Sequence, residues 1–292
     1  MAKATTARRL VSTVLTLLSF YSIPIRAAEL ISLVDKQGNA FPLAVYRVTE
    51  GSCRGIVVFS HGAGGSERGY QYLGNALPKS GWLTVIPGHR DSGPKALREE
   101  IKANTSLSEG LISLISDPNA YEARLDEVGQ ALAWARAQCP QAQYRVLAGH
   151  SMGAATALIE AGAQNKLGVR GRDRFDAYIA LSPMGPGPVF AANAWATIKK
   201  PVLTMTGTED KALEGGWQSR TLPFQNMQGG CKWLGVVPGG SHMNFAGIGL
   251  SRRVENATLE IGLEFLRLAP KGNCSVQGLP QAYQSMLQTK AP

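Results

Sequence analysis

The sequence has few of the side chains that bind metal ions. Its 292 residues include only four histidines and four cysteines. No two of these eight side chains have the close spacing that a zinc site requires. We therefore expect no metal site in this protein. The histidines are His61, His89, His150 and His242.

Blocks of like charge and long apolar runs are missing beyond residue 28. Lysine and arginine number 30 against 21 aspartates and glutamates, a net charge of +9, but the basic residues nowhere form a block. This argues against a nucleic-acid partner. No apolar stretch there is long enough to span a membrane stably. The length beyond residue 28 suits one large domain with a sizeable core.

Residues 1–28 contain four basic side chains and no acidic one. The apolar stretch Leu10–Ile25 follows the first basic residues, and small residues come after it, which is typical of a secretory signal peptide. We expect cleavage after Ala27 or Ala28, leaving 26 basic and 21 acidic residues, a net charge of +5. The alternative is an uncleaved anchor, which the short apolar stretch and Pro24 disfavour. The sequence thus predicts an exported protein, periplasmic or extracellular.

The four cysteines fit two disulfides of an exported protein. Cys53 and Cys139 each come just before a predicted strand, and these strands are expected to be parallel neighbours. Cys231 precedes a third strand, and Cys274 follows the last helix, which should return to the same end of the sheet. We predict the pairs Cys53–Cys139 and Cys231–Cys274; the alternative is four free thiols.

Short β-branched runs alternate with longer amphipathic stretches along the chain. This alternation predicts an α/β fold with a mostly parallel central sheet and helices on both faces. We assign residues 29–272 to this domain, 94–120 to a candidate cap insertion, and 273–292 to a C-terminal tail that is loose apart from its cysteine. The predicted strands are two antiparallel ones within Leu30–Glu50, then Gly55–Ser60, Trp82–Pro87, Tyr144–Gly149, Phe175–Ser182, Lys200–Thr206 and Lys232–Val237; the predicted helices include Gly69–Ser80, Tyr121–Gln138 and Ser251–Leu268.

The motif G-x-S-x-G lies at residues 149–153, between a predicted strand and a predicted helix. In that context the motif places a serine on a sharp turn, with neighbours where only glycine fits. We predict that Ser151 is a nucleophile and that His150, fixed within the turn, points away from it. The alternative is a glycine-rich turn with a solvated serine.

A serine nucleophile needs a base, and an imidazole base needs a carboxylate to orient it. His242 is the only histidine that follows the serine in the chain, and it comes just after a strand. Asp210 lies just past the end of another strand, with Glu209 as the competing acid. The aspartates within 173–176 precede a strand and so belong to the wrong edge of the sheet. The predicted triad is Ser151, Asp210 and His242.

A glycine-rich loop follows the first buried strand, and such a loop can aim backbone amides at an oxygen that becomes negative. We predict that the amides of Ala63 and Met152 form an oxyanion hole. Candidate residues of the substrate pocket are His61, His89 and Met184. For His61 the favoured interpretation is a structural role, the bracing of the loop. The alternative is a solvated loop for His89 and core packing for Met184.

Four segments resemble a known family of α/β-hydrolases, the predicted dienelactone hydrolases, which include the platelet-activating-factor acetylhydrolases and are related to cutinase-like polyester hydrolases. The likeness spans Arg54–Leu268 and implies the α/β-hydrolase fold and a serine esterase with the triad above. Two departures concern the substrate. Dienelactone hydrolases use a cysteine where this chain has Ser151, and cutinase-like enzymes carry an aromatic residue in place of Ala63 and often a tryptophan near Met184. The segments are Phe59–Gly74, Ala148–Gly153, Thr206–Asp210 and Gly239–Phe245.

The sequence therefore predicts a secreted serine hydrolase that cleaves a small-molecule or lipid-like carboxylic ester through an acyl-enzyme. This chemistry needs no metal or organic cofactor. One alternative is an acyltransferase or amidase on the same triad. Another is a non-catalytic secreted binding protein with the hydrolase fold. No oligomeric state is predicted.

Overall fold

The computed structural model describes residues 28–291 except for 50, 214 and 250. The predicted signal peptide therefore lies outside the described residues, apart from its last position. Among the residues that are described, no helix combines the length and the apolar character needed to cross a bilayer.

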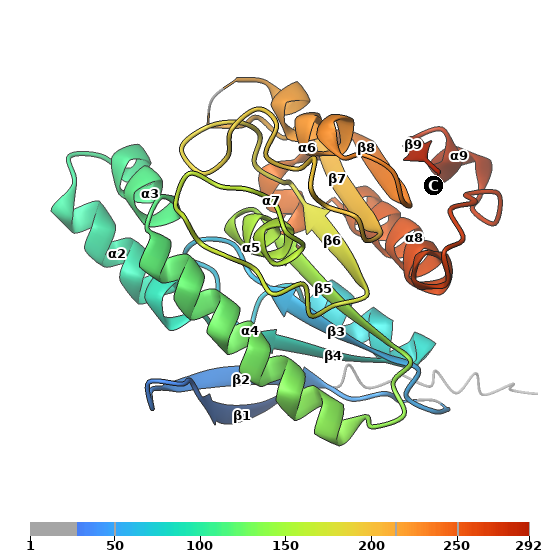
Figure 1. Ribbon diagram of the computed structural model, residues 1–292, viewed down its shortest axis with the longest axis horizontal. Coiled ribbons are helices and arrows are strands. Elements are labelled where there is room, and N and C mark those ends of the chain that lie inside the picture. Colours follow the sequence, from blue (N-terminus) through green and yellow to red (C-terminus); the bar gives the residue numbers. More distant parts are fainter. Residues whose placement is uncertain (1–27, 50, 214, 250, 292) are drawn as a thin grey trace, which may run out of the picture.

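One sheet of nine strands forms the centre of the described part of the chain, in the order β1-β2-β4-β3-β5-β6-β7-β8-β9 (Figure 1). From β4 to β8 all neighbours are parallel, whereas β1, β2 and β9 pair antiparallel. The predicted α/β fold with a mostly parallel sheet is confirmed. The strands are β1 (Glu29–Val34), β2 (Ala40–Tyr46), β3 (Gly55–Ser60), β4 (Trp82–Pro87), β5 (Tyr144–His150), β6 (Ala177–Leu181), β7 (Val202–Glu209), β8 (Lys232–Ser241) and β9 (Leu287–Lys290).

Helices cover both faces of the sheet (Figure 1). Successive side chains of a strand point to opposite faces, so Ile56 and Val58 of β3 join one apolar core while Val57 and Phe59 join the other. Helices α4 and α5 complete the first core, and α1 and α8 complete the second. The helices are α1 (Gln71–Ala76), α2 (Pro94–Ala103), α3 (Leu107–Ile115), α4 (Pro118–Gln138), α5 (Met152–Glu160), α6 (Leu222–Asn226), α7 (His242–Phe245), α8 (Arg252–Leu268) and α9 (Gln281–Gln284).

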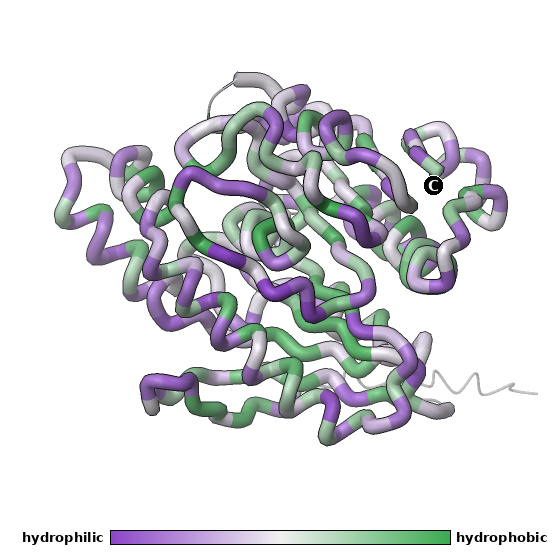
Figure 2. The backbone as a smooth tube through the Cα atoms, viewed as in Figure 1, coloured by the Kyte–Doolittle hydropathy of each residue, from purple (hydrophilic) through white to green (hydrophobic). Residues whose placement is uncertain are grey.

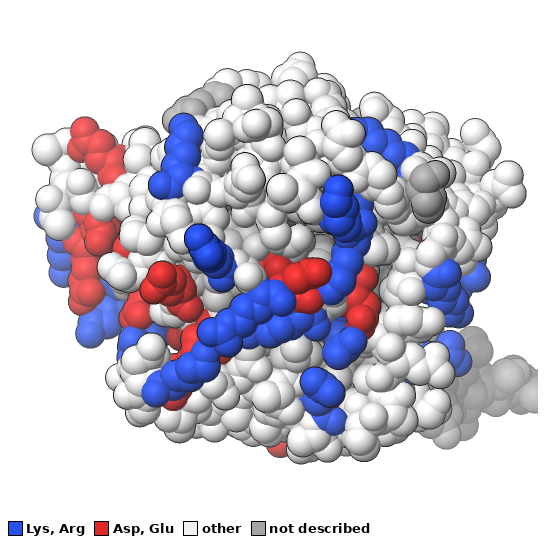
Figure 3. Space-filling view, in the orientation of Figure 1, with Lys and Arg blue, Asp and Glu red and all other residues white. Residues whose placement is uncertain are grey.

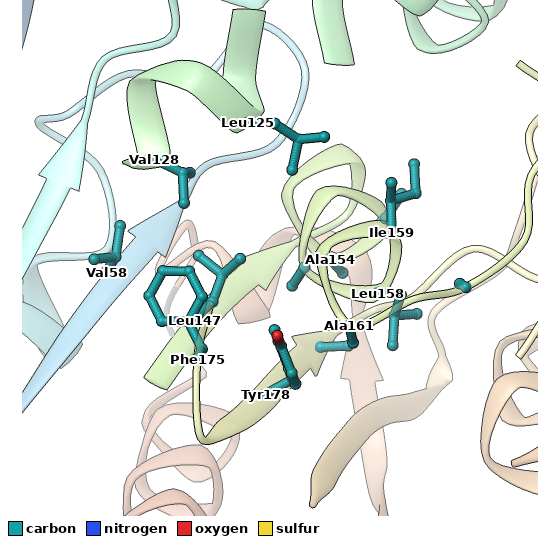
Figure 4. Packing of buried hydrophobic residues seen from close by; sticks show 14 of the residues in the cluster. Val58, Leu125, Val128, Leu147, Ala154, Leu158, Ile159, Ala161, Phe175 and Tyr178 are labelled. Carbon is teal, nitrogen blue, oxygen red and sulfur yellow. The ribbon is translucent and has the colours of Figure 1, made fainter. Parts of the chain in front are cut away.

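Figure 4 shows the packing of the first core. Val128 of α4 and Ala154 of α5 lie beside Leu147 of β5, and Leu125 and Leu158 belong to the same buried cluster. Burying one such side chain is worth about 1.5–3 kcal/mol. Figure 2 shows the same separation along the backbone, with hydrophobic central strands and mostly hydrophilic outer loops. This packing gives the loops at the strand ends a rigid support.

Lysines and arginines form a diagonal band across the centre of the face shown in Figure 3, and aspartates and glutamates lie along its edges. Ion pairs join Arg145 to Asp176 and Arg174 to Glu160 at 2.8 and 2.6 Å. The acidic groups beside this band therefore offset part of its positive charge.

Residues 94–120 form a helical hairpin of α2 and α3, followed by the start of α4. Ser106 caps α3 by accepting a hydrogen bond from the Glu109 amide at 3.2 Å. Gly110 of α3 lies against the backbone of Ile101, where a side chain would collide with α2. The close packing at this glycine holds the two helices together.

The prediction of a loose C-terminal tail is wrong. Strand β9 extends the sheet by pairing with β8. The Lys290 ammonium donates hydrogen bonds of 2.8–3.0 Å to the carbonyls of Phe224, Gln225 and Met227 at the end of α6. A cation is favourable there because the last carbonyls of a helix have no partner within the helix. No local pattern predicted this strand, because β9 is short and largely polar.

Two disulfides join the cysteines in the predicted pairs, Cys53–Cys139 and Cys231–Cys274. The first pair links the segments that lead into β3 and β5, which are parallel neighbours. The sequence separation is 86 residues in the first pair and 43 in the second. Cross-links of this kind restrict the unfolded chain.

Replacement of both Cys53 and Cys139 by serine should lower the free energy of unfolding by about 2–5 kcal/mol, because the unfolded chain regains the freedom that the cross-link removes. Urea denaturation followed by circular dichroism measures this change. The oxidised and fully reduced forms of the unaltered protein serve as the comparison. Equal urea midpoints for variant and parent would show that this disulfide contributes no stability.

Candidate active site

Ser151 lies at a sharp turn between β5 and α5. Its backbone has φ 55° and ψ −117°, an angle pair that non-glycine residues seldom adopt. The Ser151 amide donates to the Leu181 carbonyl of β6 at 3.0 Å, which fixes the turn against the sheet. Strain of this kind is maintained only where the surrounding structure enforces it.

The two glycines of the G-x-S-x-G motif are required by close backbone contacts. A side chain at Gly149 would collide with the Gly153 carbonyl, and one at Gly153 would collide with the Ser60 carbonyl at the end of β3. The turn is therefore pressed both on itself and on the neighbouring strand. This contact puts the serine beside the loop that follows β3.

His242 begins α7, directly after β8, and its Nδ1 lies 2.9 Å from Oδ1 of Asp210. Asp210 follows β7 and is fully buried. The competing acid, Glu209, is exposed. The structure thus brings the predicted base and acid together, with Nδ1 of the imidazole facing the carboxylate.

The Asp210 carboxylate is held by two residues that the sequence did not single out. Thr206 Oγ1 donates to Oδ2 at 2.9 Å, and Arg220 Nε lies 2.9 Å from Oδ1. Burial by itself would raise the pKa of Asp210, but the His242 hydrogen bond and the Arg220 charge outweigh it and keep that pKa below its usual value. Asp210 is therefore ionised and can orient the imidazole.

Ser151 and His242 line one pocket of about 230 Å³. Its walls come from α3, from the loop after β6 and from the loop after β7. Most of the lining side chains are apolar, and the described lining residues include no aspartate or glutamate. The lining residues are Leu111, Ile115, Ser151, Met184, Gly185, Pro186, Gly187, Pro188, Val189, Lys211, Ala212, Leu213, Ser219, Arg220 and His242.

Of the two residues predicted to donate oxyanion-hole amides, Met152 directly follows Ser151, and Ala63 belongs to the loop after β3. Met152 is the first residue of α5, whose first amides have no acceptor within the helix. Among the described residues, neither amide donates to a protein acceptor. Gly62, just before Ala63, has its α-carbon so close to the turn that an added Cβ would lie 3.4 Å from Ser151 Cβ.

His61 and His89 do not line this pocket. The candidate assignment to the pocket is therefore wrong for His89, whereas the contacts of His61 match its favoured interpretation, the bracing of the loop. Both are buried, at 0% and 2% exposure. His61 Nδ1 donates to the Gly62 carbonyl at 2.7 Å, and its Nε2 accepts from the His89 amide at 3.0 Å. His89 lies between Ser60 and Glu127, at 2.8 and 2.7 Å. Both rings brace the loop from inside the protein, whereas Met184 does line the pocket.

Arg124 of α4 is the centre of this bracing network, and the sequence analysis missed it. Its guanidinium is buried and donates to Ser92 Oγ at 2.7 Å, to Ser60 Oγ at 3.1 Å and to the His61 carbonyl at 2.7 Å. Burial lowers the pKa of Arg124 to about 10, so it remains charged. A signal was present, because Arg124 lies four residues before Val128 and so shares the apolar face of its helix.

The serine turn lies in a part of the chain that matches a known protein family. The Hydrolase_4 family, described as serine aminopeptidase, S33, matches residues 51–198, about half of the chain. The chain belongs to this family. It is therefore a hydrolase with the α/β-hydrolase fold, and the matched region contains the serine turn and the loop after β3. No curated protein sequence matches the chain.

Solved structures share the fold at low identity. Pyrococcus horikoshii acylaminoacyl peptidase matches with a TM-score of 0.59 and 14% identity over 89% of this chain but 44% of its own. The chain thus spans less than half of that peptidase. A Klebsiella pneumoniae protein assigned as a dienelactone hydrolase has a TM-score of 0.59 and 15% identity over 82% of this chain and 99% of its own. Thermogutta terrifontis esterase 2, phosphoramylated by tabun, has a TM-score of 0.56 and 16% identity over 85% and 96%.

The buried state of His61 predicts a pH dependence of stability. Burial and the Arg124 charge lower the pKa of His61 from 6.5 to about 3. As the pH falls below about 6.5, His61 is protonated in the unfolded chain but stays neutral in the folded protein. The free energy of unfolding therefore decreases as the pH falls from about 6.5 to about 3. In His61→Asn the decrease in unfolding free energy between pH 7 and pH 5 should be about 2 kcal/mol smaller.

Urea titrations of both proteins at pH 7 and pH 5 measure this difference. The asparagine amide keeps a donor near the position of Nδ1, so the variant retains the contact with the Gly62 carbonyl. An equal decrease in the unfolding free energy of the two proteins between pH 7 and pH 5 would show that the folded protein does not hold His61 neutral.

Proposed function

We propose that the protein is an exported serine hydrolase that cleaves carboxylic esters with Ser151, His242 and Asp210. One observation carries this proposal: the Asp210–His242 pair opens onto the same pocket as Ser151. Because Nδ1 of His242 faces the carboxylate, Nε2 is left to receive the serine proton. The family membership and the strained serine turn support the same assignment.

The proposed reaction has two steps. Ser151 Oγ forms a bond to the ester carbonyl carbon while Nε2 of His242 takes the serine proton. The carbonyl oxygen becomes negative and accepts hydrogen bonds from the amides of Ala63 and Met152. His242 then gives its proton to the leaving alcohol as the carbon–oxygen bond breaks. Water, activated by the same histidine, releases the acid from the acyl-enzyme.

The pocket favours an ester over the peptide substrate that the family description suggests. An aminopeptidase must hold the ammonium group of its substrate, for which a carboxylate is the natural partner. The described residues that line the pocket include Lys211 and Arg220 but no acid, and residue 214 lies outside the description. Two cations beside an apolar wall suit a neutral or anionic acyl group.

We further infer that residues 94–120 act as a small cap. Helix α3 contributes Leu111 and Ile115 to the wall of the pocket that Met184 also lines. The pocket would then close over an acyl chain, with the cap above and the loop after β6 below. A small-molecule or lipid-like ester fits an apolar site of this size.

Export and subgroup belong to the same proposal. The two disulfides suit an oxidising compartment such as the periplasm or the extracellular space, and residues 1–28 have the signal-peptide pattern. The Klebsiella protein is matched over nearly its whole length, unlike the peptidase. This supports a single-domain hydrolase of the dienelactone-hydrolase and platelet-activating-factor-acetylhydrolase group, with a more distant relation to cutinase-like enzymes.

Replacement of Ser151 by alanine should reduce the turnover of p-nitrophenyl acetate by roughly a thousandfold or more, because the acyl acceptor is lost. Labelling by a fluorophosphonate probe should disappear in the same variant. The parent protein should cleave p-nitrophenyl esters in preference to aminoacyl p-nitroanilides. Undiminished esterase activity in the variant would reject the nucleophile, and preferred cleavage of the anilides would identify a peptidase.

Met184→Trp tests the position of the acyl pocket. The larger ring should fill part of the space beside Ser151, so octanoyl esters should lose about tenfold or more in kcat/KM relative to acetyl esters. Val34→Trp, at an exposed position of β1, is the matched control and should leave the ratio unchanged. An unaltered chain-length preference in the Met184 variant would place the acyl chain elsewhere.

A further inference from the structure

A chain of buried hydrogen bonds lies beneath the candidate site. The Gly62 amide donates to the Tyr70 hydroxyl at 3.0 Å, and that hydroxyl lies 2.9 Å from His150 Nδ1. His150 Nε2 lies 3.1 Å from the backbone carbonyl of His242. The side chains of Tyr70 and His150 belong to residues that are only 5% and 3% exposed. None of these contacts was apparent from the sequence.

The groups at the two ends of this series of hydrogen bonds determine which atom donates and which accepts in each bond. The His242 carbonyl can only accept, so His150 carries its proton on Nε2. Burial, followed by the charge of nearby His242, holds the pKa of His150 well below its usual value, so the ring has one proton and its Nδ1 is an acceptor. Tyr70 must then donate its hydroxyl proton to Nδ1, and its oxygen accepts from the Gly62 amide.

These hydrogen bonds join three loops at the candidate site. Gly62 precedes Ala63, whose amide is proposed to hold the oxyanion. His150 precedes Ser151, and His242 is the proposed base. The bonds therefore fix the oxyanion loop after β3, the serine turn after β5 and the base loop after β8 relative to one another.

The backbone of Tyr70 indicates that this arrangement is enforced. Its φ of 56° and ψ of 30° lie in the left-handed region, which is costly for a residue with a bulky side chain. Tyr70 precedes α1 without capping it through a side-chain hydrogen bond. The phenol ring packs 4.4 Å from the Phe59 ring and its hydroxyl makes the two bonds above. Strain that persists at such a point is often tied to function.

We propose that Tyr70 and His150 are positioning residues, which set the distance of the Ala63 amide from Ser151 and so the stabilisation of the oxyanion. The proposal rests on the proposed function, because it assigns that amide to the hydrolytic reaction. Neither side chain lines the pocket. Their loss should therefore affect the transition state more than the binding of substrate.

The first test uses Tyr70→Phe, which removes the hydroxyl and keeps the ring. Its kcat on p-nitrophenyl acetate, corrected for active sites titrated with a fluorophosphonate, should fall about tenfold to a hundredfold, since small displacements of an oxyanion donor are costly. The KM should stay within about twofold. A boronic acid, which mimics the tetrahedral intermediate, should bind more weakly by the same factor as kcat/KM.

Tyr121→Phe is the matched control. The Tyr121 hydroxyl is also buried, but among the described residues it has no hydrogen-bond partner. Its removal tests the cost of changing a buried tyrosine without breaking a bond. The titrated kcat and the boronic acid affinity of this variant should equal those of the parent.

His150→Gln provides an independent variant. The glutamine Nε2 can still donate toward the His242 carbonyl, but the only acceptor of the amide, Oε1, is bonded to the same carbon and does not occupy the position of Nδ1 that faces Tyr70. Its kcat should fall in the same direction as in Tyr70→Phe, which also removes the acceptor of the Gly62 amide. The double variant should be no slower than Tyr70→Phe alone, because both changes break the Tyr70–His150 bond.

Two results would overturn the positioning role of Tyr70 and His150 while leaving the proposed function intact. One is a titrated kcat and boronic acid affinity in Tyr70→Phe equal to those of Tyr121→Phe. The other is losses that multiply in the double variant. Failure of the parent to hydrolyse the ester, or full activity in Ser151→Ala, would instead overturn both the proposed function and the positioning role of Tyr70 and His150.

Discussion

The loop after β3 and the turn after β5 touch so closely that only glycine fits at position 153. Gly153 meets the Ser60 carbonyl, and Gly62 faces the His150 ring and Ser151. This contact puts the proposed oxyanion donor and nucleophile in one place. The parallel pairing of β3 with β5 produces it, because both strands deliver their loops to the same edge. The remaining buried polar groups keep the two loops in this relation.

Two buried arginines show how that relation is kept. Arg124 donates to groups on the loops after β3 and β4, and Arg220 donates to the carbonyls of Ser182 and Pro183 besides contacting Asp210. A buried cation is costly unless its donors are satisfied. Each guanidinium therefore fits only one arrangement of its loops. We infer that the two arginines select one conformation of these loops. Apolar side chains of similar volume could stabilise the fold equally.

The sequence predicted those parts of the protein that depend on local pattern. Strand β3 and helix α8 appear at the predicted positions because β-branched runs and a 3.6-residue period are local signals. The types of residue at the strand ends also led to Ser151 and His242. Arg124 and Tyr70 were missed because their partners are far away in the chain. His89 was assigned to the pocket because it follows a strand at the edge of the sheet where the site lies, and its buried partners Ser60 and Glu127 could not be read from the sequence. Strand β9 carries too little apolar pattern to be recognised.

The sheet ends differently on its two sides. On one side β9 is only four residues long, carries Lys290 at its end and covers β8, which leads to His242. On the other side β1 is longer, pairs with β2 alone among the described strands, and exposes about half of the surface of Leu30 and Val34. Short, lysine-bearing margins resist intermolecular strand addition, whereas apolar ones invite it. Self-association through β-augmentation should therefore begin at the N-terminal margin, distant in the sheet from the strand that precedes the proposed base.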